Sequence, residues 1–123
     1  MTNPAASIGQ SLIENMSYTV IAVDKDGIIN AWNRAAELML GFSASEVLGQ
    51  HANLVIPLSM QAAHGNCFSK AMAEPKEFAI RKDITLPFMH KSGAMIKING
   101  NLALLKDAHG VPQGSEVIGA VAE

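Results

Sequence analysis

Apolar positions recur with a helical period in some segments and a strand period in others, and the changes of period mark the predicted elements. In the segment from Ser7 to Met16, Ile8, Leu12 and Met16 are four residues apart, which predicts one face of an amphipathic helix. Ser7 is a residue type that caps helix starts. Because this helix lies outside the main pattern, its apolar face must pack on its own sheet or on a second subunit.

A hairpin is predicted directly after this helix. Thr19 to Asp24 is rich in β-branched residues, which favours a strand. Asp26-Gly27 is typical of a tight hairpin turn, because glycine readily adopts the positive φ that such a turn needs. Gly27 to Trp32 is then predicted to be the partner strand.

Two short helices are predicted next from their capping residues. Asn33 can cap a helix that runs from Arg34 to Leu40 and ends at Gly41. Ser43 and Glu46 then have the spacing of a capping box, in which the two side chains satisfy free amides at a helix start.

The second half of the chain is predicted to contain one long helix followed by three strands. In order, the pattern places a helix from Leu58 to Ala73 ended by Pro75, a strand from Ile80 to Phe88, a turn at Lys91 to Gly93, a strand from Ala94 to Leu105, a loop from Asp107 to Gly114 and a strand from Glu116 to Ala122. Hairpins at each end of this order favour an α+β fold. We expect a five-stranded antiparallel sheet with helices on one face and an N-terminal cap helix.

Composition excludes several functions. The 123 residues are 49% hydrophobic, a size and content typical of one domain with a substantial core. The net charge of −2 leaves no basic excess for nucleic acid. The single cysteine excludes an internal disulfide and a multi-cysteine zinc site. No segment is apolar enough to span a membrane, and the first residues do not form a signal peptide, so we expect a cytoplasmic domain without direct membrane contact.

Several short motifs match, as a set, one known family. They are the Asp26-Gly27 hairpin, Trp32-Asn33 with Ala35-Ala36-Glu37, Gly41-Phe42-Ser43, Glu46-Val-Leu-Gly49, and Lys91-Ser-Gly93 before a long strand. This set resembles the PAS domain, a sensory module of many bacterial signalling proteins, from Tyr18 to about Val121. The resemblance implies a flanking helix at 1–17 and a PAS domain at 18–123. It implies a non-enzymatic sensor that binds a small ligand, cofactor or partner and relays the signal by conformational change or dimerisation.

His64 is the candidate cofactor ligand. It lies in IPLSMQAAHGNCFSKA, which resembles the corresponding helix of the bacterial heme-PAS oxygen sensors, where a histidine at the matching place ligates heme iron. The resemblance implies heme b between this helix and the last strands, with Ile84, Gly100, Leu102 and Gly119 as candidate wall residues. A glycine inside a strand often marks a close approach to the backbone, although both glycines could instead only ease sheet twist. A histidine here could equally be a surface or hydrogen-bonded residue of a PAS domain without heme.

One departure from the oxygen-sensor pattern bears on the signal. In the oxygen sensors, the strand before the corresponding turn carries an arginine or a methionine that hydrogen-bonds bound oxygen or ligates the iron. Counted back from Gly93, the position of the arginine corresponds to Ile84 and that of the methionine to Lys82. A distal side without a donor would hold oxygen less tightly, because bound oxygen carries partial negative charge. With heme bound, carbon monoxide, nitric oxide, redox state or weakly held oxygen would be the expected signals. Met89 and Met95 are candidate sixth ligands.

Three functions stay open at this stage. They are a heme-based gas or redox sensor, a cofactor-free PAS interaction module, and a PAS pocket for a small organic ligand or flavin. The partners expected are a second copy bound through the N-terminal helix and a signalling partner or fused output domain. Cys67, three residues after His64, is either a redox-sensitive thiol or a small buried residue.

Overall fold

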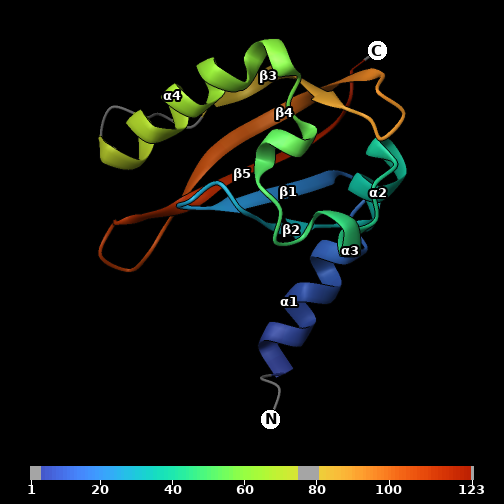
Figure 1. Cartoon of the computed structure of the whole chain (residues 1–123). Helices are drawn as coiled ribbons and strands as arrows, with labels where there is room; N and C mark the ends of the chain where they lie inside the picture. Colours follow the sequence, from blue (N-terminus) through green and yellow to red (C-terminus); the bar gives the residue numbers. More distant parts are fainter. Residues whose placement is uncertain (1–3, 75–80, 123) are drawn as a thin grey trace.

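Five antiparallel strands form one sheet, and the helices between β2 and β3 lie along one of its faces (Figure 1). The computed structural model describes residues 4–74 and 81–122. In chain order the elements, with η for a 3-10 helix, are α1 (Pro4–Glu14), β1 (Thr19–Asp24), β2 (Ile29–Trp32), α2 (Arg34–Leu40), α3 (Ala44–Val47), η1 (Ala52–Val55), η2 (Leu58–Met60), α4 (Gln61–Ala73), β3 (Arg81–Met89), β4 (Met95–Lys106) and β5 (Pro112–Val121). The strand order β2-β1-β5-β4-β3 places the first strand beside the last and confirms the predicted fold class.

The first hairpin is held by its turn as the sequence predicts. The Asp24 carboxylate accepts the backbone N–H groups of Asp26 at 2.8 Å and Ile28 at 3.0 Å. Gly27 has a φ of +80°, a conformation that glycine adopts without steric cost. The same hydrogen bonds delay the second strand, which begins at Ile29 and not at Gly27.

The predicted caps of α2 and α3 are confirmed. The Asn33 side chain accepts the N–H of Ala36 at the start of α2. Ser43 and Glu46 form a complete capping box at the start of α3. The Glu46 carboxylate also lies 2.7 Å from the Lys91 ammonium, which ties α3 to the turn between β3 and β4. Hydrogen bonds from Lys91 and from the Ser43 amide lower the pKa of Glu46 to about 2.

The N-terminal helix and the last strand begin earlier than predicted. Helix α1 begins at Pro4 and not at Ser7. Proline suits the first turn of a helix, because an N–H group there would have no helical acceptor. Strand β5 begins at Pro112 and not at Glu116, because the Asp107 carboxylate closes a short turn by accepting two backbone N–H groups, those of His109 and Val111.

The segment after α3 is more divided than the sequence pattern predicts. The 3-10 helix η1 was not predicted, and His51 caps it by accepting the Asn53 N–H on Nδ1. The predicted long helix is two elements, η2 and then α4. Pro75 and Ile80, the expected end of that helix and start of the next strand, lie outside the described residues.

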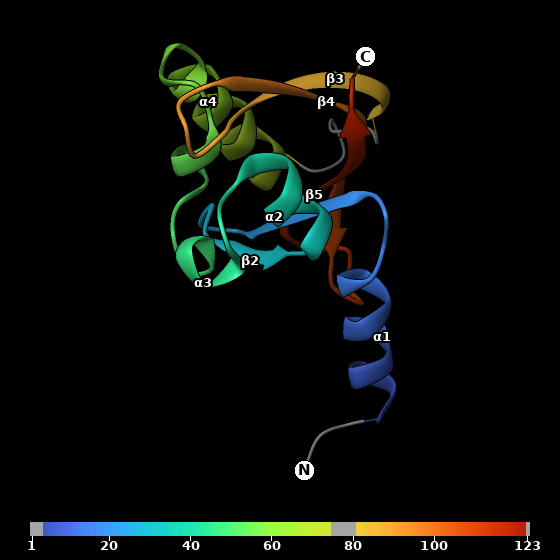
Figure 2. The ribbon, with the colours of Figure 1, turned by 90° about the vertical axis from the view of Figure 1, so that its right-hand side faces the viewer.

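The core lies between the sheet and the short helices, and α1 projects away from it (Figure 2). The largest fully buried side chains come from both layers and include Ile29, Leu40, Val47, Val55 and Ile98. Among the described residues, no helix has the length and apolar content needed to cross a bilayer.

We expect Asn33→Ala to lower the free energy of unfolding by about 2–4 kcal/mol, since it removes the partners of several buried backbone groups at once. Asn33 is 1% exposed, and its side chain makes four hydrogen bonds. Urea unfolding followed by circular dichroism measures the loss. Asn30→Ala is the matched control, because Asn30 is exposed on β2 and is expected to change stability by less than about 0.5 kcal/mol. Equal losses in the two variants would contradict the role given to Asn33.

Candidate ligand-binding site

An apolar cavity of about 220 Å³ lies between α4 and the sheet. The sheet side of its lining comes from β1, β2, β3 and β5 and includes Ile21, Leu86, Phe88 and Val117. The helical side comes from η1, η2 and α4 and includes Met60, Ala63, His64 and Cys67. The predicted pairing of His64 with a gap between helix and sheet is therefore present in the fold.

His64 is the residue of the cavity best suited to bind a ligand. Its ring stacks on Phe68 of the same helix, with centroids 6.2 Å apart and planes inclined by 14°. Partial burial lowers the pKa of His64 below its usual 6.5, and the nearby His51 lowers it further. The imidazole is therefore neutral at pH 7, and none of the hydrogen bonds within residues 4–74 and 81–122 uses its nitrogens.

The remaining lining is almost free of polar groups. Cys67 on α4 and Ser115 on β5 supply a thiol and a hydroxyl, and neither side chain makes a hydrogen bond to another described residue. Among the described residues that line the cavity there is no Lys, Arg, Asp or Glu. No group of three or more His, Cys, Asp or Glu in the described part of the chain could hold a metal ion.

The four other predicted site residues lie in the sheet but do not line this cavity. Ile84, Gly100 and Gly119 form one row across β3, β4 and β5, because Ile84 pairs with Gly100 and Gly100 with Gly119. Leu102 is in the next row, opposite the lining residue Val117. The binding roles given to these four residues stay predictions.

The close approach of neighbouring strands explains why glycine occupies both positions, and no ligand is needed to explain it. A Cβ atom on Gly100 would collide with the backbone of Ile118, and one on Gly119 with the backbone of Asn99. Neighbouring strands, and not an empty gap, occupy the space beside these positions. The sequence showed that something approaches closely here, but a strand and a cofactor leave the same signal.

Most of the chain matches the model of a known protein family. The model of the PAS fold matches residues 8–112. The chain belongs to the PAS family. The matched residues include most of α1 and all of the cavity lining except Ser115 and Val117 of β5.

Solved PAS domains share this fold at low sequence identity. The PAS domain of a protein from Colwellia psychrerythraea superposes with a TM-score of 0.78 at 15% identity, covering 96% of this chain and 97% of that one. The PAS domain of an HTR-like protein from Haloarcula marismortui gives a TM-score of 0.70 at 19% identity, covering 96% and 92%. These likenesses concern the fold alone.

One curated relative is named as a sensor. The sensor protein FixL of Bradyrhizobium diazoefficiens is 27% identical over 78 residues, which are 62% of this chain and 15% of FixL. The chain therefore spans a small part of the length of that relative. The likeness therefore concerns only the 78 matched residues of FixL.

Heme, which the sequence resemblance implies, fits this site in donor chemistry but not in space. A neutral imidazole on an apolar wall is a suitable axial ligand for heme iron. The volume of about 220 Å³ is below the roughly 300–1,000 Å³ of pockets that enclose drug-sized ligands. A porphyrin is at least as large as a drug-sized ligand, so its binding would require α4 to lie farther from the sheet.

Most of the apolar lining carries no distinct signal in the sequence. Ile21 and Val23 lie in the predicted strand from Thr19 to Asp24, but all residues from Thr19 to Val23 are buried, so no alternation marks the face toward the cavity. Met89 and Met95, the candidate sixth ligands, pair with each other beside the β3–β4 turn and are not part of the lining.

His64 is expected to make this PAS domain less stable as the pH falls. Because its pKa is lowered in the folded state, the unfolded chain binds the proton first, and the free energy of unfolding falls once the pH drops below about 6.5. His51, the capping residue before η1, is the neighbour that contributes to this shift, and Cys67 is the other titratable group among the described lining residues. Urea unfolding between about pH 5 and 8 measures the dependence, which should be weaker in His64→Gln.

His109→Gln is the control for this measurement. His109 is exposed in the turn between β4 and β5, and its pH dependence should match the wild type. If His64→Gln showed the same acid-induced loss of stability as His109→Gln, the environment assigned to His64 would be wrong.

Proposed function

We propose that this PAS domain is a sensory module that binds a small ligand in the cavity beneath α4. The observation that carries the proposal is an apolar cavity lined by a neutral imidazole that has no hydrogen-bond partner among the described residues, on a helix with little buried surface. Ala71 is the buried residue of α4, whereas the cavity-lining His64 and Cys67 are both exposed. A ligand would supply contacts that the sheet does not give this helix.

Occupation of the cavity would change the balance between positions of α4. A ligand that contacts both α4 and the sheet favours the arrangement in which both contacts form, and it can shift the populations only by that difference in affinity. Val117 brings β5 into the lining, and β5 pairs along its length with β1. Asn33 connects β1 to α1, since its amide group donates to the carbonyl of Ile13 and its oxygen accepts the N–H of Val20. This continuous set of contacts supports a relay from the cavity to α1.

A heme-based gas or redox sensor is the second candidate, favoured by the neutral imidazole of His64. In that case His64 would hold the iron and the apolar wall of Ile21, Leu86 and Val117 would exclude water from it. When bound, heme would supply an iron atom that binds gases or changes oxidation state. A cofactor-free interaction module, the third reading, would leave the cavity empty.

Hemin titration tests whether heme is the ligand. If heme is the ligand, the wild-type protein should show a saturable Soret band that carbon monoxide shifts, and His64→Ala should lose it. His109→Ala is the matched histidine control, because His109 lies in an exposed turn and should leave the band unchanged. A featureless spectrum at all hemin concentrations would remove the heme candidate and leave the small-ligand proposal in place.

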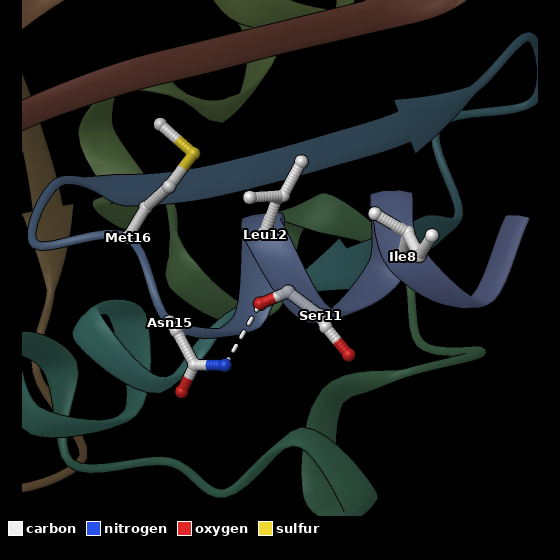
Figure 3. A pocket seen from close by; sticks show the side chains of 5 residues that line it. All are labelled: Ile8, Ser11, Leu12, Asn15 and Met16. Atoms are coloured by element: carbon white, nitrogen blue, oxygen red, sulfur yellow. Dashed lines mark hydrogen bonds between the residues drawn. The ribbon is translucent and has the colours of Figure 1, made fainter. Parts of the chain in front are cut away.

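Self-association through α1 is part of the proposal. Ile8, Leu12 and Met16 point to the same side of the N-terminal segment, while Ser11 and Asn15 occupy the neighbouring side (Figure 3). Ile8 is 62% exposed and Leu12 65% exposed, so the predicted apolar face is not covered by the sheet. A second copy of α1 would cover it with matching residues, as expected for a two-fold dimer.

Replacing Leu12 with Glu should convert a dimer to a monomer, because the charge would lose hydration in an apolar interface. Analytical ultracentrifugation at a series of protein concentrations measures the change. Leu38→Glu is the control, because Leu38 is 76% exposed on α2, is not part of the apolar face of α1, and should leave the association constant unchanged. A wild-type protein that stays monomeric at high concentration would overturn the assignment of α1.

Other parts of the proposal follow from the family and the sequence. We propose a non-catalytic domain at 18–123 with a flanking helix at 1–17, acting in the cytoplasm with a signalling partner or a fused output domain. Membership of the PAS family and the sensor FixL among the relatives support the signalling role.

A further inference from the structure

We infer that the ligand of this cavity is uncharged and compact, a single ring carrying one hydroxyl group, and this inference rests on the proposed ligand-binding function. The charge of the cavity lining, the volume of the cavity and the positions of its polar groups each support this inference.

The charge of the lining favours an uncharged ligand. The described residues that line the cavity include no Lys or Arg to pair with a carboxylate and no Asp or Glu to pair with an amine. Lys91 and Glu46 form an ion pair between the β3–β4 turn and α3, and neither residue is part of the lining. Removing an ion from water without a partner costs several kcal/mol, whereas a neutral ligand avoids this cost.

The volume limits the ligand to about one ring. An apolar cavity of about 150 Å³ in another protein accommodates benzene, and drug-sized ligands need about 300 Å³ or more. The cavity of about 220 Å³ lies between these values. The aliphatic and aromatic lining, Ile21, Val117, Leu86 and Phe88 among it, provides dispersion contacts to such a ring.

The polar groups of the cavity match a hydroxyl group. A neutral imidazole offers one N–H donor and one nitrogen acceptor, so it can bind a hydroxyl in either role. His64 is neutral at pH 7 because burial lowers its pKa, and its ring direction is set by stacking on Phe68. Ser115 on β5 provides a hydroxyl from the sheet side of the lining, and among the described residues it has no side-chain partner.

Three molecules of nearly equal shape and different charge test the inference. Benzyl alcohol, benzoate and benzylamine are titrated into the whole chain at pH 7.5, with binding followed by amide chemical shifts. Benzyl alcohol should bind saturably and shift the amides of the lining, and the two ions should bind at least about tenfold more weakly, equivalent to about 1.4 kcal/mol. Benzoate or benzylamine binding as tightly as benzyl alcohol would overturn the inference.

Two neighbouring alanines provide a matched pair of variants. Ala63 lines the cavity, whereas Ala62 lies on the same helix outside the lining. Ala63→Phe should abolish the binding of benzyl alcohol, and Ala62→Phe should keep it. His64→Phe preserves a ring and removes both nitrogens, so it should weaken benzyl alcohol about tenfold and leave toluene binding unchanged.

The inference and the proposed function can fail separately. Saturable binding of hemin at His64, with none of benzyl alcohol, would overturn the inference while the ligand-binding function stood. If neither hemin nor any of the three single-ring probes bound, both would fail. Benzyl alcohol that bound equally well to Ala63→Phe would show that it occupies another place and would also overturn the inference.

Discussion

The side chain of Asn33 connects three elements, α1, β1 and α2, through hydrogen bonds. Its oxygen accepts the N–H of Val20 in β1 at 3.0 Å and of Ala36 in α2 at 3.1 Å. Its amide donates to the carbonyl of Ile13 at the end of α1 and to that of Tyr18, at 2.9 and 2.8 Å. All of its hydrogen-bonding capacity is used in a buried position, so any other side chain would leave several backbone groups unpaired.

The cavity has one wall that depends on this connection and one that does not. Ile21 and Val117 face the cavity from β1 and β5, strands that pair from Thr19 to Asp24 and are held at one end through Asn33. The opposite wall, α4, buries only Ala71 and carries no comparable buried polar anchor in its described residues. A rigid wall opposite a loosely packed helix allows a small ligand to change the position of one element without unfolding the other.

Sequence reasoning identified residues whose role is local and missed those whose role depends on contacts between distant segments. The capping hydrogen bonds of Asn33, Ser43 and Glu46 lie within three residues of each cap, so their spacing is a sufficient signal. The bonds that Asn33 also makes to α1 and β1 join distant segments and leave no such signal. His64 was found through a resemblance, and the fold places it at the cavity. Gly100 could not be interpreted, because a neighbouring strand and a ligand require the same absence of a side chain.

The chemistry of the cavity also limits how a signal could leave it. A charged ligand would act through long-range forces on other charges, but the lining residues that the structure describes carry none. A neutral ligand acts by packing, over the distance of direct contact, and so it must move an element that it touches. α4 is that element, and β5 is the strand that both lines the cavity and pairs with β1. The connection through Asn33 to Ile13 then links the end of α1 to the strands that line the cavity. An uncovered apolar face on α1 is where such a displacement could alter association between two copies of the PAS domain.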